Sequence, residues 1–284
     1  MYEFLIQNEY NEKLELSSMI EEYSIISIAG IDPPNAQIYE VKNAGMDGNV
    51  FNEATLEDRL IIVTFAINGP AEDNRLNLYR YLKIKKKHRL FYKNGQRDVY
   101  IDGYLESLPI GIFEQKEIAQ ATFRCVDPYF KNISSISEGF SNTKKLFEFP
   151  FNIEVDNPIP FSEYSADSMI TIINLGDVIT GGIFTIQALG TVVNPRISSV
   201  NTGEYFEFDL TMTEGQVLTV NTIEKQKSVT LNDDGYITNA ISHFTAGSDF
   251  IQITPGINDF YISASSGVEN VVGEISINTL YEGA

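Results

Sequence analysis

The chain has two histidines, His88 and His243, and these are the first residues to weigh for acid–base chemistry. His88 lies in a basic run that we expect to end a helix, and because helix C-termini attract cations we interpret it as a solvated helix-end residue. His243 follows Ser242 in an expected strand, where adjacent side chains point to opposite faces and cannot pair as base and nucleophile. The histidines therefore predict no catalytic triad.

Three other features could carry chemistry. The single cysteine, Cys125, cannot form an intramolecular disulfide or a multi-cysteine metal site, and its alternating strand predicts a buried, inert thiol. In the glycine-rich run 176–182, Gly182 stands where a phosphate-binding loop needs lysine, and no helix is expected after it. Asn232-Asp233-Asp234-Gly235 lacks the ligand spacing of a calcium loop, so we expect a hairpin turn. The sequence thus predicts no catalytic residue, no metal ligand and no cofactor.

The one basic patch is the run 83–89. Its cations could simply be the solvated end of a helix, or they could contact an acidic surface of a neighbouring subunit, which the chain's own carboxylates would supply. Specific nucleic-acid binding is the weaker interpretation, because few aromatic residues are interleaved for base stacking. The candidate subunit-contact residues are Lys83, Lys85, Lys86, Lys87 and Arg89.

The charge of the chain is strongly negative and unevenly distributed. The total is 20 Lys/Arg against 39 Asp/Glu, a net charge of −19, which opposes binding to nucleic acid or anionic lipid. Residues 1–150 hold 17 basic and 22 acidic residues (−5), whereas residues 151–284 hold 3 and 17 (−14). The first half could lie against copies of itself through ion pairs, and the second half would repel its copies and is expected to face outward.

Length and local composition indicate where the protein folds and how many domains it has. A chain of 284 residues exceeds one usual hydrophobic core, which favours two domains. The first residues lack the basic and apolar regions of a secretory signal, and no stretch approaches the roughly 20 apolar residues that span a bilayer. We therefore expect a protein that folds in the cytoplasm and does not bind membranes.

The elements that would position these residues are mostly strands. Residues 1–132 contain short apolar runs separated by turn residues, with a helix expected at about 71–86. Asn94-Gly95, between the expected strands 89–93 and 98–104, is a strong hairpin signal because both residues tolerate positive φ. These patterns predict an N-terminal β domain with one α-helix and a hairpin.

The rest of the chain predicts a second β domain. Residues 133–168 are rich in Ser, Asn and Pro and are interpreted as a connector able to contribute one or two edge strands. In residues 169–284, strand-like runs recur about every 10 to 15 residues without a helix candidate, which is typical of a β-sandwich. The fold class is therefore mostly β.

The run Ala121-Thr122-Phe123-Arg124-Cys125-Val126-Asp127-Pro128-Tyr129-Phe130 resembles the end of the first domain in the distal tail protein (Dit) family of long-tailed bacteriophages. Similar pieces follow that family's order in the rest of the chain. They are Asp58-Arg59-Leu60-Ile61, Arg75–Leu82, Asn174-Leu175-Gly176-Asp177, residues 181–186, Val193-Asn194-Pro195, Thr202-Gly203-Glu204, residues 227–231 and Pro255-Gly256-Ile257-Asn258. The resemblance covers nearly the whole chain, and its specificity comes from the number and order of these pieces.

The resemblance implies an architecture and a role. It implies that six copies of the N-terminal domain form a ring, and that a C-terminal galectin-like β-sandwich projects outward. The ring would join the tail tube, made of the major tail protein, to the tail-associated lysin or fibre hub, and in many phages it carries receptor-binding proteins. The expected location is the virion tail tip, or baseplate, of a phage or prophage, assembled in the bacterial host cytoplasm.

Other functions remain open at this point. A tail-like bacteriocin would use a homologous subunit. A cell-wall carbohydrate-binding adhesin is the alternative, with tyrosines such as Tyr205 and Tyr261 as contacts, although the chain has no Trp and so lacks the residue cluster of a galectin sugar site. A hydrolase rests only on the abundance of carboxylates. The sequence therefore favours a structural, non-catalytic protein.

Overall fold

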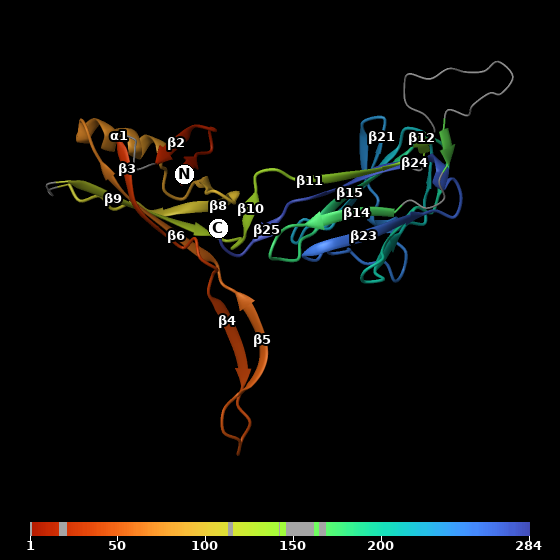
Figure 1. Cartoon of the computed structure of the whole chain (residues 1–284), viewed down its shortest axis with the longest axis horizontal. Helices are drawn as coiled ribbons and strands as arrows, with labels where there is room; N and C mark the ends of the chain where they lie inside the picture. The colour runs from red at the N-terminus through yellow and green to blue at the C-terminus, as the bar shows by residue number, and fades with distance from the viewer. Residues whose placement is uncertain (1, 17–21, 113–115, 142, 146–161, 165–168) are drawn as a thin grey trace. The chain divides into compact units, whose positions relative to one another are not determined.

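The computed structural model describes residues 2–16, 22–112, 116–141, 143–145, 162–164 and 169–284 (Figure 1). It contains two compact units: unit 1 is Met1–Ile133 with Leu280–Ala284, and unit 2 is Ser134–Thr279. The described residues form many strands, one α-helix and two short 3-10 helices. The predicted mostly β fold class is therefore confirmed.

Unit 1 is built on one antiparallel sheet with the strand order β2-β1-β7-β8-β9-β6-β3. Two short strands, β10 and β25, pair with each other, and β10 also pairs with β8. The bounds are β1 (Glu3–Gln7), β2 (Lys13–Leu16), β3 (Tyr23–Ala29), β6 (Arg59–Ile67), β7 (Lys87–Lys93), β8 (Asp98–Ser107), β9 (Glu117–Cys125), β10 (Phe130–Asn132) and β25 (Leu280–Tyr281). Alternating buried positions along β6 to β9 supply the core of the unit, which includes Phe65, Phe123 and Phe130.

The hairpin between β7 and β8 forms by a different turn from the one expected. Its loop is four residues long, from Asn94 to Arg97, and neither Asn94 nor Gly95 takes positive φ. Instead, the Asn94 side-chain oxygen accepts hydrogen bonds from the main-chain N–H groups of Gln96 and Arg97, both at 2.8 Å. Asparagine closes this loop through its side chain, which is a second way in which the residue favours turns.

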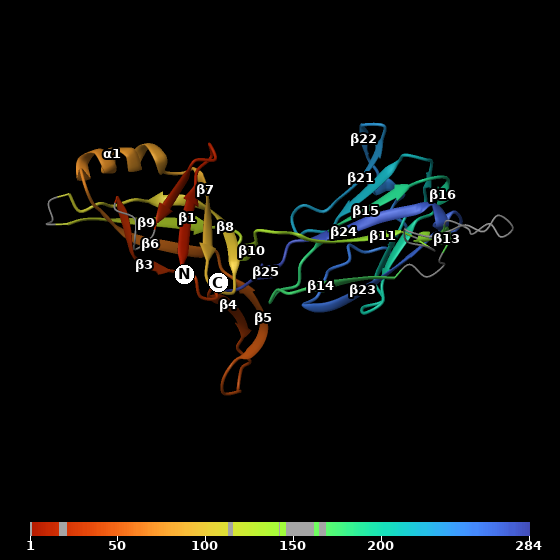
Figure 2. The same ribbon diagram turned by 45° about the horizontal axis from the view of Figure 1, so that its top comes forward.

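Helix α1 spans Ala71–Tyr81, so the predicted helix at 71–86 was too long. The chain turns extended at Leu82, whose N–H closes on the Leu78 carbonyl, and Lys85 adopts a positive φ of 67°. From Lys87 the chain belongs to β7, where pairing with β8 replaces helical hydrogen bonds. Leu78 and Leu82 pack into the core of unit 1, and Figure 2 shows α1 beside the sheet.

Arg59, the first residue of β6, is a buried cation that binds carbonyl groups from separate segments of unit 1. Arg59 is 3% exposed, and its guanidinium donates to the carbonyls of Pro128 (2.9 Å), Gly30 (2.8 Å), Asp32 (2.7 Å) and Glu282. The same group lies 4.7 Å from the centre of the Phe130 ring. A charged side chain is buried only when such partners replace water, so Arg59 joins three loops that are distant in sequence.

Residues 280–284, which the sequence placed with the second domain, lie in unit 1 instead. The main-chain N–H of Ala284 donates to the Ile31 carbonyl at 3.1 Å. Arg97 donates to the Gly283 carbonyl and stacks on Tyr281 at 4.1 Å. The sequence of residues 280–284 does not reveal that they pack in unit 1. Their contacts are with β10, Arg59 and Arg97, which are all far away in the sequence.

Unit 2 contains two larger antiparallel sheets and their connections. One has the order β11-β24-β15-β20-β21-β22, and the other β14-β23-β17-β18. The bounds are β11 (Ile136–Ser141), β14 (Met169–Asn174), β15 (Gly182–Ala188), β17 (Arg196–Ser199), β18 (Tyr205–Glu207), β20 (Val217–Asn221), β21 (Ser228–Asp233), β22 (Tyr236–Asn239), β23 (Gly256–Ser263) and β24 (Val271–Ile277). The smaller elements are β12 (Thr143–Lys145), β13 (Ser162–Tyr164), β16 (Val192–Val193), β19 (Thr211–Met212), η1 (Ile241–His243) and η2 (Val268–Asn270).

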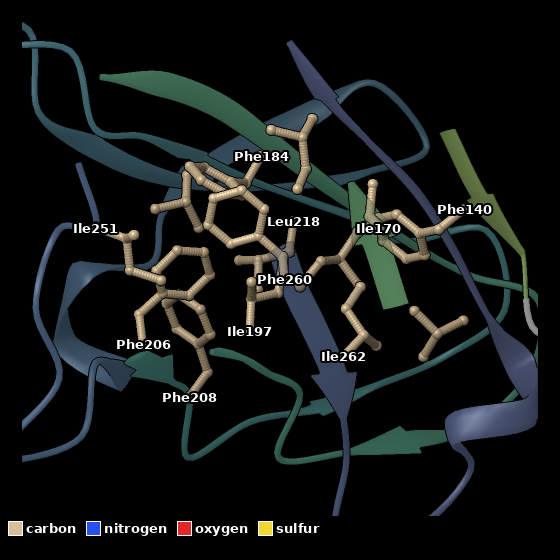
Figure 3. Packing of buried hydrophobic residues seen from close by; sticks show 14 of the residues in the cluster. Phe140, Ile170, Phe184, Ile197, Phe206, Phe208, Leu218, Ile251, Phe260 and Ile262 are labelled. Atoms are coloured by element: carbon tan, nitrogen blue, oxygen red, sulfur yellow. The ribbon is translucent and has the colours of Figure 1, made fainter. Parts of the chain in front are cut away.

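The core of unit 2 lies between these two sheets and combines phenylalanine rings with a larger number of aliphatic side chains (Figure 3). The Phe184 ring from one sheet meets Phe206 and Phe260 of the other edge-on, with ring centres 5.2 and 5.5 Å apart. Edge-to-face pairs of this kind stabilise a core beyond the area they bury. The packing of two sheets on one core is that of a β-sandwich.

Unit 2 contains the predicted hairpin turn and a strand within the predicted connector. The run Asn232–Gly235 forms the predicted hairpin turn between β21 and β22, with positive φ at Asp234 and Gly235. Within the predicted connector 133–168, β11 pairs with β24 at the edge of its sheet. Residues 142, 146–161 and 165–168 of that connector lie outside the described residues.

Candidate interaction surfaces

The five cations of the predicted basic patch differ in their ion pairing. Three of its five cations are held by carboxylates: Lys86 by Glu9 at 3.0 Å, and Lys87 and Arg89 by Asp102 at 3.0 and 2.8 Å. Burial raises the pKa of Asp102, but hydrogen bonds from Arg89 and Lys87 outweigh it and hold the pKa below its ordinary value. These cations are therefore engaged within unit 1.

Lys83 and Lys85 differ from the other three. Both are exposed in the turn between α1 and β7, and neither forms an ion pair within the described part of the chain. Ile84 between them is 47% exposed, and Leu76 and Tyr79 of α1 are 48% and 41% exposed. We call these five residues the basic–apolar surface.

A second surface of unit 1 is the hairpin of β4 (Ala36–Val41) and β5 (Val50–Leu56), which with its turn we call the arm, residues 36–56. Within the described ranges, the two strands pair only with each other (Figure 1). Every residue of β4 is exposed, as is every residue of β5 except Leu56. The large apolar side chains are Ile38 (59% exposed), Tyr39 (47%), Val41 (51%), Met46 (63%), Val50 (50%) and Phe51 (65%).

The pairing of the arm strands distributes these side chains over both faces. Val41 lies opposite Val50, and Phe51 lies opposite Glu40. The arm carries three acidic residues and one lysine, so its charge is −2. An isolated two-stranded hairpin is marginally stable in water, and exposed apolar patches mark interaction sites, so the arm has the properties of a surface completed by a partner. The sequence contains no signal that both faces of the arm are exposed.

His88 is buried, so its interpretation as a solvated helix-end residue was wrong. It is 1% exposed on β7, where alternation turns it inward beside Phe123, with ring centres 5.6 Å apart. Its Nδ1 lies 3.0 Å from the Lys86 carbonyl, and because a carbonyl only accepts, this nitrogen carries the proton. Burial lowers the pKa of His88.

A testable pH dependence follows from His88. The unfolded histidine titrates near about 6.5 and the folded one lower, so below that pH the unfolded chain binds more protons and stability falls with falling pH. We expect His88→Leu to reduce the loss of unfolding free energy between about pH 7 and about pH 5, measured by urea unfolding. His243→Leu, at an exposed histidine, is the matched control; an equal reduction in both variants would contradict this account.

His243 and Cys125, the other two candidates for chemistry, lie in environments that give them structural contacts. His243 lies in η1 rather than in the expected strand, and its Nδ1 is 2.9 Å from the Asp209 carbonyl. Cys125 is buried as predicted, and burial raises its pKa to about 12, so it remains a thiol at neutral pH. Among the described residues, no group of three or more His, Cys, Asp or Glu side chains could hold a metal ion, and no helix there is long and apolar enough to cross a membrane.

Part of the chain matches a known protein family. Residues 175–272 match the family model described as the siphovirus-type tail component, C-terminal domain. The resemblance to distal tail proteins predicted from the sequence is therefore confirmed, and the matched residues lie within unit 2.

Two solved structures extend the likeness beyond that domain. The crystal structure of the SPP1 Dit protein, described as a paradigm of the hub adsorption apparatus in phages infecting Gram-positive bacteria, matches with a TM-score of 0.70, 12% identity and 98% coverage of both chains. A chain of the phage P2 baseplate, in its activated conformation with Ca, matches with a TM-score of 0.50, 11% identity and full coverage of both chains. At these identities the likeness is one of fold. The curated proteins contain no match.

Proposed function

We propose that this chain is a structural, non-catalytic subunit of a phage or prophage tail tip, in which unit 1 joins six copies into a ring. The ring would connect the major tail protein of the tail tube to the tail-associated lysin or fibre protein, and would carry receptor-binding proteins. The role is supported by the family match in unit 2 and by the fold shared with SPP1 Dit over both units. Assembly would take place in the cytoplasm of the bacterial host.

The proposal of a ring rests on the exposed arm. Its apolar side chains are exposed on both faces, and its charge is −2. The basic–apolar surface offers the complementary chemistry, with Lys83 and Lys85 unpaired among the described residues and Ile84 between them. We propose that the arm of one copy docks on the basic–apolar surface of its neighbour, where apolar burial would give affinity and charge would set the register.

The mass of the assembled protein tests this proposal. We expect the purified chain, with a monomer mass of 31.8 kDa, to form closed oligomers that light scattering or negative-stain images identify as rings. Val50→Asp with Phe51→Asp places two charges in the proposed contact and should shift the protein to monomers. Lys83→Glu with Lys85→Glu should weaken assembly more at low salt than at high salt.

The control is a hairpin of unit 2. Tyr236→Asp changes an aromatic residue that is 74% exposed in β22 and should leave the oligomer intact. Monomers of the unsubstituted chain at every concentration, also in the presence of tail-tube protein, would contradict the proposal. Rings that survive the Val50→Asp, Phe51→Asp pair would remove the arm from the contact.

A further inference from the structure

The two sheets of unit 2 differ in what their outer faces carry. In each sheet, alternate residues turn inward to the core and the rest turn outward. The central row of the six-stranded sheet presents Thr185, Glu274, Thr219 and Thr230, which are direct neighbours across four strands. This is the polar composition expected of a sheet face in water.

The outer face of the four-stranded sheet carries exposed apolar side chains beside its polar ones. Ile173 of β14 lies directly opposite Ile257 of β23, and these side chains are 47% and 62% exposed. Met169 lies opposite Tyr261 on the same two strands, beyond the outward pair Thr171–Asp259, and these side chains are 62% and 38% exposed. Val200, 58% exposed, follows β17, and its N–H donates to the Asp259 carbonyl at 2.8 Å. We call these five residues the apolar face.

A single carboxylate lies among these side chains. Asp259 is the outward residue of β23 between Ile257 and Tyr261, and it accepts a hydrogen bond of 2.6 Å from the Thr171 hydroxyl. The only cation of this sheet, Arg196, is already used: it lies 3.4 Å from Glu207 and stacks on the Tyr205 ring at 3.7 Å. Asp259 therefore has no cationic partner on its own sheet.

We infer that the apolar face is a docking site for another protein, which presents apolar side chains around one lysine or arginine that pairs with Asp259. The exposed apolar side chains supply the contact area on both sides of the Thr171–Asp259 pair, because Ile173 lies opposite Ile257 and Met169 lies opposite Tyr261. Asp259 supplies the charge that selects a cationic partner and fixes its register.

The charge of unit 2 argues against a second copy of this unit as the occupant. Residues 134–279 hold 5 Lys/Arg and 18 Asp/Glu, a net charge of −13, so two such faces would repel each other. A carbohydrate is also less favoured, because one face of the Tyr205 ring is covered by Arg196. The inference concerns unit 2 alone and does not depend on ring formation by unit 1.

Selection from a displayed library of random peptides tests the inference on the full chain. We expect the peptides enriched on the unsubstituted protein, relative to Ile257→Ser, to share one lysine or arginine flanked by apolar residues. Asp259→Asn should weaken binding of the selected peptides by at least about tenfold in Kd. Ile183→Ser is the matched control, because Ile183 is also an outward isoleucine (37% exposed) but on the six-stranded sheet, and it should leave Kd unchanged.

Each other outcome would overturn the inference. It fails if no peptide is enriched over Ile257→Ser, if the enriched peptides lack a cation, or if Ile183→Ser weakens them as much as Ile257→Ser. Glycan-array binding that is lost in Ile257→Ser would assign the face to carbohydrate, and a changed oligomer mass in that variant would assign it to a second copy. Thermal unfolding of each variant confirms that the exposed substitution leaves the fold intact.

Discussion

Replacing Arg59 with leucine is expected to lower the free energy of unfolding of unit 1 by about 3–5 kcal/mol, because it removes four hydrogen bonds that a buried, charged guanidinium donates. The guanidinium binds the carbonyls of Gly30, Asp32, Pro128 and Glu282, and it is 3% exposed. Leucine keeps most of the apolar volume but supplies no hydrogen bond. Urea unfolding monitored by tyrosine fluorescence measures the change.

Arg124→Leu is the matched control for Arg59. Arg124 also lies on the sheet of unit 1, in β9, and pairs with Asp58 and Glu106, but in an exposed setting. Exposed ion pairs contribute little, so this variant should unfold almost like the unsubstituted protein. Equal destabilisation by the two substitutions would show that burial of the Arg59 cation is not what matters.

The Arg59 contacts also predict that unit 1 depends on residues that follow unit 2 in the chain. A chain truncated after residue 279 loses the Glu282 carbonyl and the pairing of β25 with β10. Its unit 1 should unfold at lower urea than that of the complete chain, while the unit 2 transition should stay in place. The same loss in both transitions would point to global misfolding of the truncated chain.

Replacing Gly273 with alanine is expected to destabilise unit 2 by about 1–3 kcal/mol or more, because there is no room for a side chain. A Cβ at this position would lie 2.1 Å from the Thr185 carbonyl oxygen and 2.2 Å from the Phe140 ring. Phe140 of β11 is paired with Gly273 and is 7% exposed in the core of unit 2. The variant must therefore separate β24 from β15 or displace the Phe140 ring.

Gly139→Ala separates this steric effect from the general cost of changing a strand glycine. Gly139 precedes Phe140 in β11, and the nearest atom to its Cβ would be the Gly273 oxygen at 3.7 Å, an ordinary contact. We expect little change in the midpoint of urea unfolding for Gly139→Ala and a clear decrease for Gly273→Ala. A similar midpoint for both variants would contradict the steric explanation.

The candidate surfaces show where a reading of the sequence reaches its limit. The run 83–89 is visible as a cluster of cations, but the sequence cannot show that Glu9 and Asp102 form ion pairs with three of them. Both partners are brought there by strand pairing, β1 with β7 and β7 with β8. The unpaired remainder, Lys83 and Lys85, becomes a candidate contact only after that pairing is known.

The amino-acid sequence by itself determined the features that depend on neighbouring residues. Short apolar runs predicted the β structure of residues 1–132, alternation predicted the buried thiol of Cys125, and Asn232–Gly235 predicted its turn, because strand faces and turn dihedrals follow from local residue types. The order of short motifs was enough to indicate the tail-component family.

The tertiary structure decided everything that depends on which distant segments meet. Pairing with β8 ended α1 at Tyr81 and turned His88 into the core, where the sequence had favoured a longer helix and a solvated histidine. Residues 280–284 returned to unit 1 because Arg59 and Arg97 there bind their carbonyls. Long-range pairing gains more free energy than local helix propensity, and a single sequence records the propensity but not the partner.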